Sequence, residues 1–362
     1  MAGSRVMAGS GGPGPGHGPG GVPAAIALSP ILSGRYRHGD LVRIQAAAPG
    51  SRIVTMSVEG LADGPVDDVE VLLRGWLSTD AFDRLLSRAP NLTWVHSATA
   101  GVERAFTPAA MERGIVITNA RGVFSAPIAE YVMMMVLAIS RRLPELLELQ
   151  RERTWQPLEG SELRDVTIGI VGLGSIGRAV AALAAPFGCR LIATRRHPEA
   201  SALAGGAGAL AGGAGARDGE PGLERVLGPG GLPELLAESD FVVLATPLTA
   251  DTEGMIDEDA LAAMKPGAWL INIARGRLVD ERALLRALSE NRIGGAVLDA
   301  FREEPLPSSS PFYDLPNAIL TPHTSWSSAR VLDRSVELFC ENLQRYAAGE
   351  TLRNVVDPSV GY

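Results

Sequence analysis

The chain has little of several features that would assign it to a specialised class of protein. Only two cysteines, Cys189 and Cys340, occur among 362 residues, so we expect no disulfide scaffold and a reducing, cytoplasmic setting. The 33 lysines and arginines are outnumbered by 41 aspartates and glutamates, and a net charge of -8 offers no basic surface for nucleic acid. No pair of histidines or cysteines has the spacing of metal ligands, so no metal site is expected.

Long apolar runs are also missing. The most apolar segment, Tyr131–Ile139, is much shorter than the ~20 residues that span a bilayer. The N-terminal region lacks the apolar core of a signal peptide. We therefore expect neither a membrane partner nor secretion.

Two glycine-rich stretches are too poor in large apolar residues to pack a core. Residues 1–25 form a glycine- and proline-rich tail that we expect to be disordered. Residues 205–222 interrupt an otherwise regular pattern, and we interpret them as a surface loop insertion, because loop entropy grows slowly with length. The total length suggests about two domains.

Short apolar runs, by contrast, are abundant, and polar or glycine-rich signals follow several of them. Their length and their alternation with helical patterns predict buried parallel strands, and hence an α/β fold. Ligands of such sheets bind beyond the carboxyl ends of the strands. The expected strands are Ile53–Val58, Val69–Leu73, Thr93–Val95, Ile115–Thr118, Thr167–Val171, Cys189–Ala193, Phe241–Ala245, Trp269–Ile273, Ala296–Leu298 and Ala318–Leu320.

A glycine-rich motif, Gly172-Leu173-Gly174-Ser175-Ile176-Gly177, lies between an expected strand and an expected helix. This context is typical of dinucleotide binding: Gly172 allows a tight turn, Gly174 a close approach of backbone to pyrophosphate, and Gly177 close helix–strand packing. The helix that Ser175 and Ile176 begin offers unpaired N–H groups to an anion. The alternative is a tight turn that binds nothing.

Two arginines, Arg195 and Arg196, follow the next strand, where NAD-binding proteins usually carry an acidic residue for the ribose. A carboxylate there would repel a 2′-phosphate, whereas guanidinium groups pair with it. The sequence therefore favours NADP over NAD as cofactor. The alternative is a solvated arginine pair without a ligand.

Three further residues at expected strand ends match the needs of 2-keto acid reduction. Arg275 can hold a carboxylate with its rigid fork, and His323 can donate a proton near neutral pH. Glu304 can stabilise the charged imidazole and orient its ring. Singly, each has an ordinary alternative: Arg275 as a helix cap, Glu304 as a solvated side chain, His323 as a core residue. Because all three are expected at strand ends beside the glycine loop, a catalytic role is favoured over these alternatives.

Five segments, taken together in order and spacing, resemble the D-isomer-specific 2-hydroxyacid dehydrogenase family. The resemblance covers about residues 50–357 apart from the glycine-rich insertion. The segments are Val171–Gly177, Leu244–Thr249, Asn272–Gly276, Leu298–Pro305 and Thr321–Thr324.

The resemblance implies two Rossmann- or flavodoxin-like, doubly wound parallel-sheet domains. A cofactor domain of residues 127–322 would be inserted between residues 26–126 and 323–362 of the substrate domain. It also implies that Arg275, Glu304 and His323 are catalytic, with Arg275 and His323 bordering the cofactor. Ala100 and Gly101 would hold the substrate carboxylate. Members are usually homodimers joined through the cofactor domain, to which the apolar helix Ile128–Ile139 could contribute. Further cofactor contacts are expected from Thr246, Pro247, Ile273, Ala274 and Asp299.

The function that this resemblance implies is reduction of a small 2-keto acid to a D-2-hydroxy acid by NADPH, as in glyoxylate and hydroxypyruvate reductases. Trp76, Leu77 and Trp326 are candidates for the wall of the substrate pocket, although both tryptophans can equally be packing residues. Two alternatives share the fold: a corepressor-like, dinucleotide-binding interaction protein, and a formate or phosphite dehydrogenase.

Overall fold

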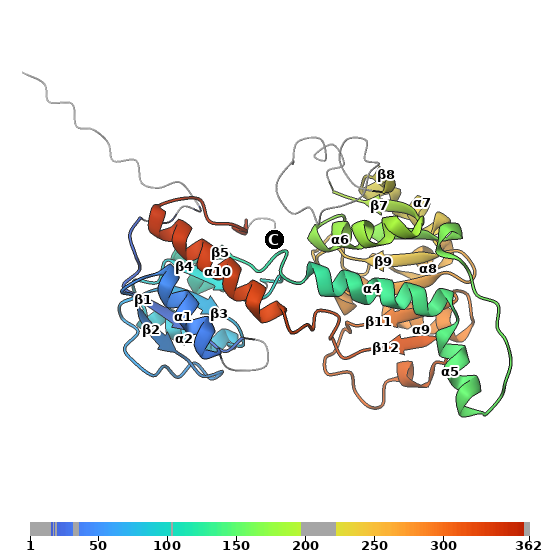
Figure 1. The fold of residues 1–362 in the computed structure, drawn as a ribbon, viewed down its shortest axis with the longest axis horizontal. Helices are drawn as coiled ribbons and strands as arrows, with labels where there is room; N and C mark the ends of the chain where they lie inside the picture. The colour runs from blue at the N-terminus through green and yellow to red at the C-terminus, as the bar shows by residue number, and fades with distance from the viewer. Residues whose placement is uncertain are drawn as a thin grey trace, which may run out of the picture. The chain divides into compact units, whose positions relative to one another are not determined.

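A computed structural model describes residues 16, 18, 20–31, 36–102, 104–196 and 222–357. The chain divides into two compact units (Figure 1). The first combines the N-terminal part up to Val123 with the C-terminal part from Ala329, and the second runs from Phe124 to Ser328. The second unit is therefore slightly longer at both ends than the expected span of 127–322, and it includes His323 and Trp326.

The first unit is built on a parallel sheet of five strands in the order β2-β1-β3-β4-β5. This is the flavodoxin-like strand order, in which ligands bind at the carboxyl edge of the sheet. The strands are β1 (Ala25–Leu28), β2 (Arg52–Thr55), β3 (Val69–Arg74), β4 (Trp94–Ser97) and β5 (Val116–Thr118). The helices are α1 (His38–Ala47), α2 (Thr79–Arg88), α3 (Pro108–Glu112) and α10 (Val331–Ala348).

Helices cover both faces of this sheet, because its strands are apolar on both sides. Phe82 and Leu85 of α2 pack with one set of strand side chains. On the other face, Ile44 of α1 and Phe339 of α10 pack together, and these two helices lie side by side (Figure 1). The C-terminal helix thus completes the core of the N-terminal part.

The prediction of a disordered tail over residues 1–25 was wrong for part of that segment. The inner strand β1 begins at Ala25, and the N–H groups of Gly18 and Gly21 donate to the carbonyls of Glu350 and Ala347. A side chain at Gly18 would collide with the backbone of Tyr346, so the glycine allows this close approach. Residues 1–15 lie outside the described residues, as does the expected insertion 205–222 except for Gly222.

The second unit contains a parallel sheet of seven strands in the order β12-β11-β10-β9-β6-β7-β8. The strand order reverses between β6 and β9, which is the switch point where doubly wound sheets bind ligands. The strands are β6 (Thr167–Val171), β7 (Arg190–Thr194), β8 (Leu223–Leu227), β9 (Phe241–Leu244), β10 (Trp269–Asn272), β11 (Gly295–Leu298) and β12 (Ala318–Leu320). The helices are α4 (Ser125–Ser140), α5 (Leu143–Arg151), α6 (Ser175–Ala184), α7 (Leu232–Glu238), α8 (Glu258–Ala263) and α9 (Glu281–Ser289).

These two doubly wound sheets confirm the predicted α/β fold class. In the second unit, α4 packs against α6, and most of the apolar residues of α4 are buried. Within the described residues, no helix is long and apolar enough to cross a membrane.

Candidate active site

The glycine loop turns sharply from β6 into α6. Gly172 has a φ of 103°, and a Cβ atom on it would come within 2.8 Å of the backbone of Ala245 and Thr246. A Cβ atom on Gly177 would press against the carbonyl oxygen of Gly172, so this glycine allows α6 to pack on the loop. Gly174 differs, because nothing lies within 4 Å of its Cβ position. The loop therefore leaves open space at Gly174, at the N-terminus of α6.

The described arginines at the end of β7 lie near this loop. The backbone carbonyl of Thr194 accepts hydrogen bonds from the N–H groups of Gly172 and Leu173, which ties the β7 end to the glycine loop. Arg195 donates its backbone N–H to Leu227 at the end of β8. The side chain of Arg196 lies 3.6 Å from the carboxylate of Asp251, in the loop after β9. Both guanidinium groups thus follow the strand next to β6, where an adenosine ribose would lie.

Arg275 is presented by a short, well-bonded turn after β10. The buried Asn272 accepts a hydrogen bond from the N–H of Ala274 and donates its Nδ2 to the carbonyl of Arg275. The half-buried guanidinium donates to the carbonyl of Ala274. Gly276 next to it packs directly on the backbone between Phe301 and Arg302, in the segment that leads to Glu304.

Glu304 and His323 form a paired carboxylate and imidazole. His323 Nδ1 lies 2.9 Å from Glu304 Oε2 and 3.1 Å from Oε1. The N–H of Phe301 donates to Glu304 Oε1 at 2.9 Å and so fixes the carboxylate. The side chains remain 39% and 38% exposed, so a small molecule can reach them from outside the unit. Nδ1 is thus the nitrogen of His323 that contacts Glu304, and Nε2 is the other ring nitrogen.

Asp299 is buried beneath the loop that carries His323. Its Oδ1 accepts from Thr321 Oγ1 at 2.5 Å and from the N–H of Thr324 at 2.8 Å, and its Oδ2 accepts from the N–H of Ser325 at 2.9 Å. Since the hydroxyl of Thr321 donates its single proton to Asp299, it accepts one from Tyr131, 2.7 Å away on α4. Burial raises the pKa of Tyr131 to about 12, so the phenol keeps its proton.

In the second unit, the structure therefore groups the predicted site residues at one edge of the sheet. A family model described as the D-isomer specific 2-hydroxyacid dehydrogenase, NAD binding domain, matches residues 133–210 and 220–325. A glyoxylate reductase from Korarchaeum cryptofilum is 35% identical over 305 residues, covering 82% of this chain and 85% of the relative. The chain belongs to the D-isomer specific 2-hydroxyacid dehydrogenase family. This confirms the resemblance seen in the sequence, and it makes the protein a member of a family of NAD(P)-dependent oxidoreductases.

Solved structures of this dehydrogenase family are similar to the chain over almost its whole length. A D-isomer specific 2-hydroxyacid dehydrogenase from Xanthobacter autotrophicus, in complex with NADPH and MES, is 28% identical, with a TM-score of 0.79. The alignment covers 94% of this chain and 100% of that one. An NADPH-dependent glyoxylate/hydroxypyruvate reductase from Sinorhizobium meliloti, with NADP and sulfate, is 25% identical, with a TM-score of 0.76, and the alignment covers 93% and 100% of the two chains.

The residues of this family member fit a dinucleotide. The open position at Gly174, the start of the ten-residue helix α6 and the turn at Gly172 provide a cradle for a pyrophosphate. Thr246 and Pro247 follow β9, and the buried Ile273 and Ala274 follow β10, so these four residues border the same edge of the sheet. Within the described residues, no group of three or more histidine, cysteine, aspartate or glutamate side chains is placed to hold a metal ion.

The predicted substrate residues of the first unit lie after β3 and β4. Trp76 is 54% exposed, but Leu77 is buried in the core with Phe82 and Leu85, so its side chain packs inward rather than lining an open wall as predicted. The carbonyls of Ala100 and Gly101 accept hydrogen bonds from Asn119 Nδ2 and Thr99 Oγ1. Within the described part of the chain, the N–H groups of Ala100 and Gly101 have no protein acceptor.

Arg74, which sequence reasoning missed, holds the loop that presents Trp76. It is buried at the end of β3, donates Nη2 to the carbonyl of Leu77, and stacks over the ring of Phe82 at 5.2 Å. Burial, with a smaller contribution from Arg104, lowers the pKa of Arg74 to about 10. Its position directly before Gly75-Trp76 at the end of an apolar run was the available signal.

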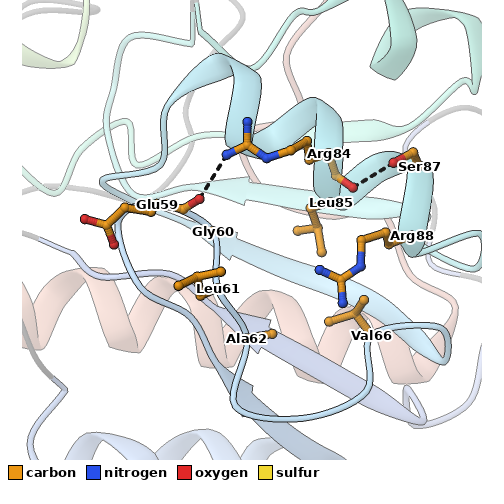
Figure 2. A pocket seen from close by; sticks show the side chains of 9 residues that line it. All are labelled: Glu59, Gly60, Leu61, Ala62, Val66, Arg84, Leu85, Ser87 and Arg88. Carbon is orange, nitrogen blue, oxygen red and sulfur yellow. Dashed lines mark hydrogen bonds between the residues drawn. The ribbon is translucent and has the colours of Figure 1, made fainter.

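A hollow of about 320 Å³ lies elsewhere in the first unit, between α2 and the loop that follows β2 (Figure 2). Arg84 donates to the carbonyl of Glu59 on its rim, and the side chain of Arg88 reaches across it above Val66. None of the predicted site residues lines this hollow. Its lining residues are Glu59, Gly60, Leu61, Ala62, Val66, Arg84, Leu85, Ser87 and Arg88.

Proposed function

We propose that this protein is an NADPH-dependent reductase of small 2-keto acids that forms D-2-hydroxy acids. The observation that carries this proposal is the accessible pair of His323 Nδ1 and Glu304 Oε2, 2.9 Å apart, at the sheet edge that also bears Arg275. A general acid needs an oriented donor, and the carboxylate of Glu304 orients the imidazole of His323 by its contact with Nδ1.

In this proposal, the chain's own residues bind the substrate and move the proton. The guanidinium of Arg275 pairs with the substrate carboxylate, assisted by the N–H groups of Ala100 and Gly101. His323 Nε2 donates its proton to the oxygen at C2, and Glu304 orients the imidazole through Nδ1. When bound, the nicotinamide supplies the hydride. Asp299, expected to contact the cofactor, also stabilises the His323 loop through the hydrogen bonds described above.

The preference for NADP rests on Arg195 and Arg196, which occupy the place of the usual acidic residue. A doubly charged 2′-phosphate would compete with Asp251 for Arg196, because that ion pair is exposed and therefore weak. Two similar solved structures carry NADPH or NADP, which supports the same preference. Arg195→Asp should lower kcat/KM with NADPH and raise the ratio of NADH to NADPH efficiency. An unchanged ratio would contradict the assignment of Arg195.

In this proposal, the substrate side chain contacts Trp76, which lies exposed after β3, and Trp326. We infer that these aromatic walls favour an apolar 2-keto acid side chain. Equal rates with glyoxylate and phenylpyruvate would count against that inference.

The deciding experiment measures NADPH and NADH oxidation with a panel of 2-keto acids, for the native protein and for His323→Ala. We expect turnover with NADPH and a loss of kcat of at least about 100-fold in the variant, since general acid catalysis contributes on that order. Tight NADPH binding without turnover of any 2-keto acid would overturn the proposal and favour a dinucleotide-binding interaction protein.

We also infer a homodimer joined through the second unit, in the cytoplasm. None of the residues of α5 is buried, and its side chains Leu143, Leu146 and Leu147 are exposed together with Trp155 in the following segment. Exposed apolar sets of this kind mark contact surfaces. The two cysteines are both free thiols, which supports a reducing compartment.

A further inference from the structure

The backbone of His323 is held in an uncommon conformation. Its φ is 50°, in the left-handed region that side chains other than glycine rarely adopt. Such a conformation persists only where the surroundings determine it, and it occurs often at active sites. The residues that hold the peptide of His323 therefore matter for where its imidazole lies.

Two different groups hold this part of the chain. Asp299 accepts from the N–H groups of Thr324 and Ser325, which come after His323. The peptide of His323 itself is held at both ends: its N–H donates to the carbonyl of Thr321 at 2.9 Å, and its carbonyl accepts from Trp326 Nε1 at 2.7 Å. Trp326 supplies the only side-chain hydrogen bond to the His323 backbone within the described residues.

Trp326 is itself fixed in place. Its ring is half-buried and meets the ring of Phe124 edge to face, with centroids 6.2 Å apart and planes at 85°. An edge-to-face pair of aromatic rings adds a specific orientation to their packing. The indole N–H is thus aimed at the His323 carbonyl from a stable position, while the imidazole on the same residue faces Glu304.

We propose that Trp326 is a positioning residue for the reaction, acting through His323. Its N–H holds the left-handed peptide and so keeps the imidazole aligned with Glu304 and directed at the substrate. This inference rests on the proposed function of His323 as the proton donor. It differs from the role of Trp326 as a pocket wall, because a wall acts on substrate binding, whereas a positioning residue acts on the chemical step.

The test compares Trp326→Phe, which removes the N–H and keeps a ring against Phe124, with the native protein. We expect kcat for glyoxylate to fall about three- to tenfold, the size of one hydrogen bond, with KM values for glyoxylate and NADPH unchanged. The primary isotope effect on kcat with NADPH deuterated at the transferred position should rise, because hydride transfer becomes slower relative to product release. A raised KM with unchanged kcat would overturn the proposal and leave Trp326 as a wall.

A second measurement does not depend on turnover. The chain has five histidines, so the imidazole nitrogen signals of His323 can be assigned in ¹⁵N NMR spectra by their loss in His323→Ala. In Trp326→Phe we expect these signals to shift or broaden, while those of the buried His96, which belongs to the first unit, stay in place. Unchanged His323 signals would refute the proposal even if the native protein turned over no 2-keto acid.

The matched control is Trp269→Phe. Trp269 begins β10 at the opposite end of that strand from Arg275, and its ring packs beside Gly294 and Gly295. This variant removes an indole N–H from the same unit without touching the His323 loop. It should therefore leave kcat, the isotope effect and the His323 signals unchanged, and a change equal to that in Trp326→Phe would contradict the positioning role.

Discussion

His96 and His323 are both associated with parallel strands, but their surroundings give them opposite properties. His323 is accessible and paired with Glu304. His96 in β4 is fully buried between Trp94 and Phe339, and its Nδ1 lies 2.8 Å from Thr118 Oγ1. Burial lowers the pKa of His96 to about 3, so it stays neutral in the folded protein. Its position on a buried strand therefore makes it a structural residue of the first unit.

This burial predicts a dependence of stability on pH. The pKa of an unfolded histidine is about 6.5, so as pH falls from about 6.5 towards 3 the unfolded state binds a proton that the folded state does not. The free energy of unfolding should therefore fall with decreasing pH, by up to about 1.4 kcal/mol per unit from this residue alone. In His96→Gln, urea denaturation at pH 7, 5.5 and 4.5 should show a shallower decrease.

The control for this experiment is His38→Gln at the exposed start of α1, which should keep the native slope. If His96→Gln and the native protein lost stability in parallel between pH 6.5 and 4.5, the contribution assigned to His96 would be incorrect.

At the scale of elements, the helix α4 is connected by hydrogen bonds to the ends of two strands next to His323. Tyr131 of α4 donates to Thr321 directly after β12, and Thr321 donates to Asp299 directly after β11. This chain of hydroxyl groups connects a helix to two strand ends beneath His323. No single segment of sequence contains it, since its members lie 190 and 22 residues apart.

A variant at Gly174, directly before α6, can distinguish an effect on folding from an effect on cofactor binding. Gly174→Ala adds a methyl group into open space, and the φ of Gly174 is -83°, which alanine adopts without strain. We expect the melting temperature to stay unchanged and NADPH affinity, measured by fluorescence titration, to fall at least about tenfold, because the methyl group occupies the path of the pyrophosphate.

Gly177→Ala is the contrasting variant. Its methyl group would press on the carbonyl of Gly172 inside the protein, so we expect a lower melting temperature as well as weaker binding. Unchanged NADPH affinity in Gly174→Ala would show that the loop does not carry the cofactor.

At the scale of the whole molecule, the exposed apolar residues of α5 and Trp155 predict the assembly. We expect light scattering after gel filtration to give twice the chain mass of 38.0 kDa. Replacing Leu146 with Glu should shift the protein towards the chain mass, because burying an unpaired carboxylate in the contact would cost several kcal/mol.

Leu61→Glu is the control, since Leu61 is an exposed leucine in the first unit, away from α5 in the sequence. A native protein that runs at the mass of one chain, or a Leu146→Glu variant that stays dimeric, would exclude this surface as the interface.

Much of the fold could be predicted because apolar runs mark buried strands. The strands Thr167–Val171 and Ala318–Leu320 are found as expected, and the other expected strands are found with ends shifted by a few residues. The missed elements include the strands β1 and β8 and the helix α5. β1 is only four residues long and adjoins the glycine-rich tail, β8 is a half-polar edge strand, and α5 has no buried face to give it a clear apolar stripe.

The sequence by itself determined the class of the protein: a parallel α/β fold, a dinucleotide loop, and an arginine, a glutamate and a histidine at successive strand ends. These follow from local rules, because strand periodicity and glycine spacing act over a few residues. Only the tertiary structure decided that Leu77 is a core residue and that Trp326 donates to the His323 carbonyl. It also decided that the Asp299 carboxylate accepts from three groups of the His323 loop. Those roles depend on which segments the fold brings within hydrogen-bond distance, and no local pattern carries that information.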